Sequence, residues 1–132
     1  MAIRQTEPRF FDIPTNLQVH PVRNDLLRLV DIEAIKRSVR NIVLTNPGER
    51  KFSPNFGVGL RNYLFENFTR DTAYIIEEKT REQLRLHEPR CRLIRILINQ
   101  RDDENTLTVD ILFSIINNPE PIRLELILTR VR

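Results

Sequence analysis

The stretch LRLHEPRCRLIRILINQ, residues 84–100, joins a helical pattern directly to a strand pattern. Before it, apolar residues recur every three or four positions, which is helical spacing. After it, apolar residues recur at every second position, which is strand spacing. Pro89 lies between the two patterns, and a proline pushes the preceding residue away from helical geometry. The stretch therefore predicts a helix that ends near Leu86 and a strand that follows at once.

Strand spacing continues to the C-terminus in three runs separated by turn sequences. The turns are QRDDENT and NNPEP, which are rich in residues that favour turns. The predicted inward rows are Ile94, Ile96 and Ile98; Leu107, Val109, Ile111, Phe113 and Ile115; and Ile122, Leu124, Leu126 and Leu128. Three runs joined by short turns predict a three-stranded antiparallel meander.

The opposite face of this predicted sheet also carries apolar residues. These are Leu93, Leu97, Leu112, Ile116 and Ile127, where a solvent-facing sheet surface would carry polar ones. Such a face needs a cover, which is either the N-terminal arm, the long internal loop or another protein. The first and last strands are also predicted to be open edges without an interior proline, and open edges accept strands from partners.

Two helices and a long loop are predicted upstream of the sheet. Asp31 is the expected N-cap of a helix from Ile32 to Leu44, and Thr69 that of the helix ending near Leu86. Between them, TNPGERKFSPNFGVGL predicts a structured loop, with Phe52 and Phe56 pinning it to the domain. A short helical segment follows the loop, and its predicted buried side is Leu60, Leu64, Phe65 and Phe68.

These patterns predict an α+β domain in which helices pack on the C-terminal meander. Residues 1–24 contain three prolines and no sustained period, so they are expected to form an extended N-terminal arm. The arm's apolar residues favour packing along its own domain or along a neighbour. Residues 25–132 are expected to form one domain, because 132 residues are too few for two comfortable ones.

Composition excludes several classes of function. The formal net charge is only +3, and the basic residues are interleaved with acids, so a nucleic-acid partner is not expected. Only three of the 21 basic residues are lysines, and arginine is the residue favoured at protein interfaces. A GC-rich genome that favours arginine codons explains the same bias. No signal peptide and no long apolar span are found, so a soluble chain without a membrane partner is expected.

No motif predicts a catalytic or metal site. One cysteine and two histidines are too few for a zinc cluster, and Asp102, Asp103 and Glu104 form only half of a calcium loop. Cys91 and His87 lack the surroundings of a nucleophile. The best enzymatic alternative pairs Glu66 with Glu88 as acid and base of a glycosidase. We therefore expect no enzyme, no cofactor and no small-molecule substrate.

Several segments taken together resemble a known family. IKRSVRNIVLTNPGERKFSPNFGVGLRNYLFENF, residues 35–68, contains a Thr-x-Pro-Gly-Glu-Arg turn, a Pro-x-Phe-Gly loop and Leu-Phe-Glu, and Glu-Pro-Arg follows later. The combination is similar to the short baseplate wedge proteins of contractile-tailed bacteriophages, a family shared with type VI secretion baseplates. Some of its members have been labelled lysozymes. The resemblance covers about residues 26–131.

The resemblance implies a structural component of the virion tail baseplate, assembled in the host cytoplasm in six copies. It implies that Glu88, Pro89 and Arg90 dock on the core helical bundle of the other wedge subunits, near the tail tube or hub. It also implies that the sheet resembles the sheath's strand-exchange module and is the platform on which sheath assembly starts. The edge residues would be Ile94, Ile96, Ile98, Leu124, Leu126 and Leu128, and the structural loop would comprise Pro47, Gly48, Glu49, Arg50, Pro54, Phe56 and Gly57. The alternative is a peptidoglycan-cleaving, lysozyme-like glycosidase.

Overall fold

A computed structural model describes residues 11–12, 29–30, 32–66, 68–101, 105–116 and 118–130. The chain divides into two compact units within helix α1, residues 1–37 and residues 38–132, and each is described by itself. The predicted boundary between residues 24 and 25 lies outside the described residues, as do most of the arm and the acidic turn at 102–104.

In the first unit, two short strands pair with each other. β1 (Phe11–Asp12) is antiparallel to β2 (Leu29–Val30), so a segment of the predicted arm pairs with the chain that leads into α1. Helix α1 spans Ile32–Leu44 as predicted, and Glu33 lies in its first turn, where an acid favours the helix dipole. Ile32 falls at helical spacing with Ile35, Val39 and Ile42, which predicts that it shares their buried stripe, but Ile32 is exposed.

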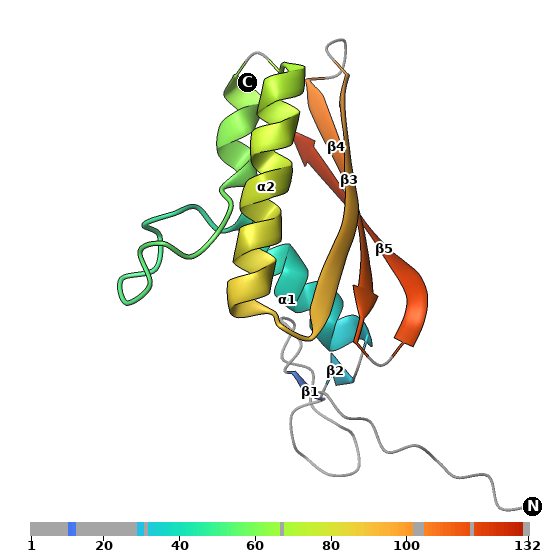
Figure 1. Ribbon diagram of the computed structural model, residues 1–132. Helices are drawn as coiled ribbons and strands as arrows, with labels where there is room; N and C mark the ends of the chain where they lie inside the picture. Colours follow the sequence, from blue (N-terminus) through green and yellow to red (C-terminus); the bar gives the residue numbers. More distant parts are fainter. Residues whose placement is uncertain are drawn as a thin grey trace, which may run out of the picture. The chain divides into compact units, whose positions relative to one another are not determined.

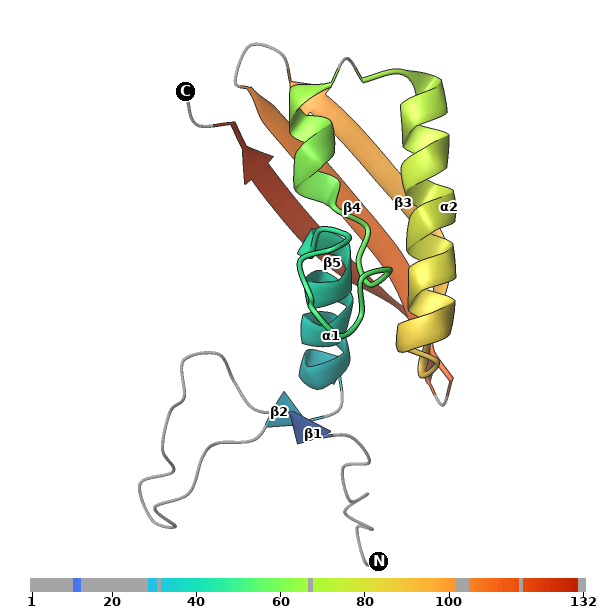
Figure 2. The ribbon, with the colours of Figure 1, turned by 90° about the vertical axis from the view of Figure 1, so that its left-hand side faces the viewer.

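The second unit has a layer of helices on one face of a sheet (Figures 1 and 2). The layer contains residues 38–44 of α1, the 3-10 helix η1 (Leu60–Phe65) and α2 (Arg70–His87). The sheet contains β3 (Cys91–Arg101), β4 (Thr106–Ile115) and β5 (Asn118–Thr129). Its strand order is β3-β4-β5 and both pairs are antiparallel, so the predicted meander is confirmed.

Helix α2 begins and ends for the reasons expected from its sequence. The Thr69 hydroxyl accepts a hydrogen bond from the N–H of Thr72 (3.3 Å), which caps the first turn. Ile76, Thr80 and Leu84 form its buried stripe, and the Thr80 hydroxyl donates back to the carbonyl of Ile76 (2.7 Å). The helix ends at His87, because Pro89 cannot continue it.

The core lies between the helices and the inner face of the sheet. Strand β4 supplies its centre, since all five residues of its predicted inward row are buried. Fully burying such a side chain contributes roughly 1.5–3 kcal/mol each. The other large members of the core in this unit are Val39, Ile42, Val43, Phe56, Val58, Leu60, Ile76, Leu84, Leu93, Ile96, Ile122 and Leu126.

The first strand departs from simple alternation. Leu93 pairs with Phe113 and Arg95 pairs with Leu112, so Ile94 is an extra residue in a β-bulge. The bulge reverses the phase: Leu93 and Ile96 are buried on the inner face, whereas Ile94 is 45% exposed. The prediction that Ile94 shares a face with Ile96 and Ile98 was therefore wrong, as was the outward placement of Leu93.

Three further expectations were wrong. Phe52 does not pin the loop, because its side chain is 99% exposed at the loop's projecting end, whereas Phe56 is buried. Phe65, expected on the buried side of η1, is largely exposed. The NNPEP segment is not only a turn: β5 begins at Asn118, so Pro119 and Pro121 lie within an edge strand, where proline is tolerated.

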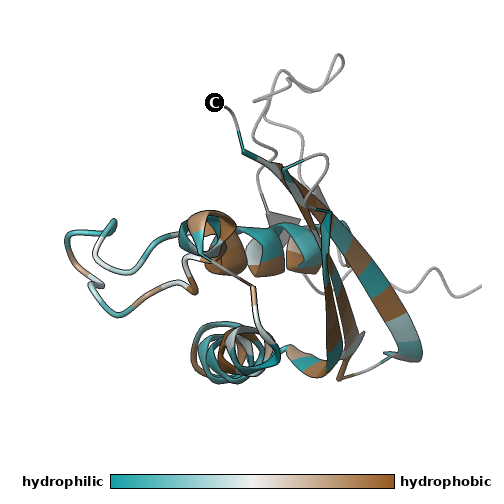
Figure 3. Cartoon of the chain, turned by 90° about the horizontal axis from the view of Figure 1, so that it is seen from above, coloured by the Kyte–Doolittle hydropathy of each residue, from teal (hydrophilic) through white to brown (hydrophobic). Residues whose placement is uncertain are grey.

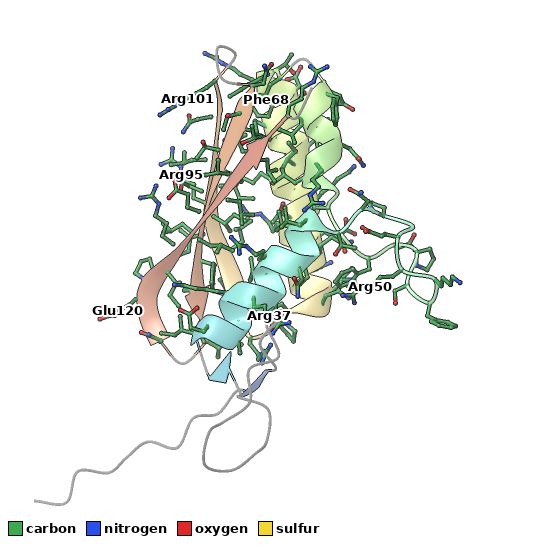
Figure 4. All side chains as sticks on the ribbon, turned by 180° about the vertical axis from the view of Figure 1, so that it is seen from behind. Arg37, Arg50, Phe68, Arg95, Arg101 and Glu120 are labelled. Carbon is green, nitrogen blue, oxygen red and sulfur yellow. The ribbon has the colours of Figure 1, made fainter. Side chains whose placement is uncertain are left out.

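Within the second unit, no described element covers the outer face of the sheet (Figure 3). Leu97 and Ile127 are exposed there, 44% and 63%, as the pattern predicted. Arg123 donates from its Nε atom to Asp110 Oδ1 on the neighbouring strand (2.9 Å), also on this face. Figure 4 shows Arg95 and Arg101 pointing from the sheet away from the helices.

Candidate functional site

The first candidate site is the junction between α2 and β3, which contains Glu88, Pro89 and Arg90. Glu88 is the C-cap of α2, and its N–H donates to the carbonyl of Leu84 (2.8 Å). The carbonyl of Glu88 accepts hydrogen bonds from the N–H (3.2 Å) and the thiol (3.5 Å) of Cys91. The chain thus turns from helix to strand within three residues and is held by its own backbone.

Within this turn the acid and the base bind each other. The guanidinium of Arg90 forms a two-point ion pair with the carboxylate of Glu88, with Nε donating to Oε1 and Nη2 donating to Oε2 (2.7 Å). Such paired contacts fix orientation as well as adding energy. The Glu88 side chain is 3% exposed and the Arg90 side chain 33%. The buried Glu88 therefore fixes the position of the partly exposed Arg90.

Electrostatics keep the buried Glu88 charged. Burial alone would raise the pKa of its carboxyl, but hydrogen bonds from Arg90 and Ser38, together with the charge of Arg90, hold the pKa below its ordinary value. Ser38, on α1, was not recognised from the sequence, because no local pattern links it to a residue fifty positions away.

The three residues of the predicted docking motif thus have different positions. Pro89 is exposed and Arg90 is partly exposed, but Glu88 is buried. A partner that approaches this junction meets Pro89 and the outer side of Arg90. The junction thus presents the guanidinium of Arg90, held in one orientation, beside the rigid apolar ring of Pro89.

The two outer edges of the sheet are the second candidate site, and they differ. On β3, the bulge at Ile94 interrupts the edge, and Arg81 of α2 donates from Nη1 to the carbonyl of Leu93 (3.5 Å). Both devices block the pairing of an added strand. On β5, no described strand pairs with the edge opposite β4. Of the six predicted edge residues, Ile96 and Leu126 are buried, and Ile98, Leu124 and Leu128 are half-buried.

The predicted structural loop is held by its backbone to the end of α1. The N–H of Val58 donates to Ile42 O (3.1 Å), and that of Gly59 donates to Thr45 O (2.9 Å). Gly57 has a φ of +104°, and a Cβ there would lie 2.2 Å from the carbonyl oxygen of Thr45, so only glycine fits. Its N–H donates to Gln83 Oε1 on α2 (2.8 Å), a contact that sequence analysis missed.

Other residues of the loop are fixed by side-chain contacts. The N–H of Asn46 donates to Glu49 Oε2 (2.9 Å), and the N–H of Gly48 donates to Pro54 O (2.8 Å). Arg50 lies over the ring of Phe56 at 3.9 Å. The Phe56 ring also meets the edge of His87, with 4.7 Å between ring centroids. The Pro47–Gly57 segment is therefore fastened to the end of α2, next to the junction.

The residues considered for catalysis are not brought together. Glu66 precedes α2 and Glu88 ends it, and an 18-residue helix is about 27 Å long, whereas glycosidase carboxylates lie about 5–9.5 Å apart. Burial, followed by the charge of Glu88, raises the pKa of the Cys91 thiol to about 12, so it is protonated at neutral pH. His87 packs against Phe56 instead of orienting a nucleophile.

The described residues contain no group of three or more histidine, cysteine or acidic side chains placed to hold a metal ion. Among the helices that the structure describes, none is long and apolar enough to cross a membrane.

Solved structures of tail proteins share this fold. A structure named as a tail lysozyme from Geobacter sulfurreducens matches with a TM-score of 0.64 and 30% identity, over 76% of this chain and 91% of that chain. A chain of the anti-feeding prophage baseplate matches with a TM-score of 0.60 and 20% identity, over 89% and 83%. A chain of the post-contraction pyocin R2 baseplate matches with a TM-score of 0.58 and 23% identity, over 80% of this chain and 95% of that chain. At their identities, the last two show the fold alone.

Sequence comparisons identify the family. Residues 30–120 match the family model described as baseplate wedge protein gp25. The chain is also 38% identical over 98 residues to the baseplate wedge protein gp25 of Enterobacteria phage T4, and the match covers 74% of each chain. The family match spans more than half of the chain, and the resemblance seen in the sequence is confirmed. This chain belongs to the family of the baseplate wedge protein gp25.

Proposed function

We propose that this chain is a structural component of a contractile-tail baseplate, where it joins the core of the wedge to the tail sheath. Its relative in phage T4 is a baseplate wedge protein, and two of its structural matches are chains of baseplates, which supports the baseplate role. In this proposal six copies assemble in the host cytoplasm, and each binds other wedge subunits on one side and sheath protein on the other. No step of the function is catalytic.

The observation that carries the docking half of the proposal is the two-point ion pair beneath Pro89. Glu88 fixes the direction of Arg90 before any partner arrives, so little side-chain entropy is lost on binding. A partly exposed guanidinium is suited to carbonyl or carboxylate groups of the core helical bundle. Glu88 acts through Arg90, and Pro89 with Arg90 makes the contact.

The docking contact is tested with the double variant Glu88→Gln with Arg90→Gln. Removing both charges avoids a buried charge without a partner, which would unfold the chain for an unrelated reason. We expect a folded chain that binds the cognate wedge subunits at least about tenfold more weakly, a loss typical of a buried hot-spot contact. The matched control is Arg95→Gln, on the outer face of the sheet. Wild-type affinity in the double variant would disprove docking through this junction.

For the sheath half, the proposal assigns strand addition to the β5 edge. The β3 edge carries a bulge and the Arg81 contact, whereas β5 continues for eight residues beyond Pro121. Backbone pairing along such an edge supplies affinity, and alternate side chains supply register. Six equivalent edges in one ring would add avidity.

A proline scan from Arg123 to Leu128 tests this assignment. A proline whose missing N–H would have faced β4 destabilises the chain, whereas one whose N–H would have faced outward leaves the thermal midpoint nearly unchanged. We expect baseplates that carry the second kind of variant to assemble and to fail in starting a sheath. Sheaths of normal length on all such baseplates would refute the β5 edge.

The glycosidase alternative has only a name in its favour. One structural match is named as a tail lysozyme, but α2 keeps Glu66 and Glu88 at its opposite ends in this chain. We expect the purified protein to release no soluble fragments from peptidoglycan. Hydrolysis that Glu66→Gln abolishes would reinstate the enzymatic function.

A further inference from the structure

A groove of about 330 Å³ lies beside the proposed docking contact, between the last turns of α2 and the start of β3. Its apolar lining comes from Leu84, Pro89, Cys91 and Leu93. Its polar lining consists of three arginines, Arg81 and Arg85 from α2 and Arg92 from β3. A groove with an apolar floor and cationic sides has both the parts that a specific protein-binding site uses.

The charged residues that line this groove are all positive. None of the described residues that line it is acidic. Arg81 is balanced by Glu77 (3.0 Å) and Glu78 (3.8 Å), but within the described part of the chain neither Arg85 nor Arg92 forms an ion pair. The nearest buried acid, Glu88, is neutralised by Arg90. Two exposed arginines therefore face the groove without a counter-charge.

Leu84, Cys91 and Leu93 are buried within the chain, so Pro89 is the exposed apolar residue of this groove, and an apolar side chain of a partner would pack against it. Cys91 contributes to the apolar floor as a neutral thiol, because burial raises its pKa to about 12. The carbonyl of Leu93 already accepts from Arg81 (3.5 Å), so this backbone acceptor beside the groove has a partner within the chain. Recognition here therefore depends on side chains, in contrast to backbone pairing at the β5 edge.

We infer that this groove binds an acidic segment of a baseplate protein, with an apolar side chain of that segment against Pro89 and carboxylates paired to Arg85 and Arg92. The inference rests on the proposed docking at Pro89 and Arg90 and extends that contact, because Pro89 lines both surfaces. The planar forks of Arg85 and Arg92 suit carboxylates in paired geometry. The apolar floor and the small net charge of +3 favour a protein segment over a nucleic acid.

The inference is tested by reversing the charge of the groove in Arg85→Glu with Arg92→Glu. The matched control, Arg61→Glu with Arg95→Glu, makes the same change in net charge at two exposed arginines outside the groove. We expect the groove variant to bind the cognate wedge subunits at least about tenfold more weakly than the control, because like charges would then meet. Both variants should keep the wild-type thermal midpoint.

A milder variant guards against misfolding. Arg85→Gln with Arg92→Gln removes the charges without adding new ones, and its affinity should fall less between 0.1 M and 0.5 M salt than that of the wild type, because screening acts on the charges it lacks. Equal affinity of the groove variant and the control would overturn the inference and leave the docking at Arg90 standing. A wild-type chain that does not bind the wedge subunits at all would overturn both. Tight binding of duplex DNA that groove reversal abolishes would assign the groove to nucleic acid and refute an acidic protein segment.

Discussion

The two faces of the sheet are made by the same three strands but have different roles. On the inner face, β4 places its inward row, Leu107, Val109, Ile111, Phe113 and Ile115, in a closed core under the helices. On the outer face, Leu97 and Ile127 remain exposed among charged residues, and Asp110 binds Arg123 across the strands. The free energy of folding is therefore supplied mainly by the inner face. The outer face is free to vary or to meet a partner.

The same substitution made on each face measures this difference most directly. Ile111→Ala, on the inner face of β4, should lower the free energy of unfolding by about 4 kcal/mol, since it leaves a cavity in the core. Ile127→Ala, on the outer face of β5, should lower it by less than about 1 kcal/mol. Urea unfolding of both variants gives the two values. Equal losses would mean that the outer face is covered.

Neighbouring residues at the bulge sharpen the comparison. Leu93→Ala should cost about 3 kcal/mol and Ile94→Ala less than about 1 kcal/mol, because the bulge places Leu93 on the same inner face as Ile96 and leaves Ile94 on the outer face. Strict alternation gives the reverse order. The ranking of the two urea midpoints therefore decides whether the bulge is present in solution.

Glu88 is the one charged residue that is buried in the described part of the chain. Substituting it measures what a buried charge contributes to stability. Glu88→Gln should cost about 2 kcal/mol at neutral pH, which is less than the loss of a fully buried ion pair because Arg90 is partly solvated. The pKa of Glu88 is lower in the folded state, so its contribution is complete above its ordinary pKa of 4.5 and is lost as the pH falls below that value.

The measurement is the difference in unfolding free energy between wild type and Glu88→Gln, followed from pH 7 to pH 3. This difference should shrink at the acid end of that range. Glu125→Gln is the control, because that carboxylate is exposed on β5. A difference that does not change with pH would show that Glu88 is not held charged by its neighbours.

Much of the fold follows from local patterns in the sequence. The bounds of α1, the Thr69 cap and the inward row of β4 are set by spacing and by capping chemistry, which act between residues close in the chain. The inward face of strand β3 was harder to predict, because apolar residues occupy both odd and even positions of CRLIRILINQ. A bulge can therefore exchange the two faces without any sign in the sequence. The first residues of β5 were assigned to a turn, because the prolines among them are typical of turn sequences.

The candidate site was only half predictable. Pro89 could be recognised as the end of a helix, but the burial of Glu88 depends on Arg90 folding back and on Ser38 from a distant helix. The exposure of Phe52 was missed because an aromatic residue in a loop was assumed to anchor it. The arginines of the groove come from two elements, so their proximity appears only after α2 and β3 have packed together.

The burial of Cys91 gives the molecule a built-in kinetic reporter. It is the only cysteine in the chain, and it lies where α2 turns into β3. Although Cys91 lines the groove, it is only 7% exposed and protonated, so it reacts with a small disulfide reagent mainly when its surroundings open. The rate of labelling at neutral pH therefore reports how often this junction opens in the native protein, without an added dye or an engineered residue.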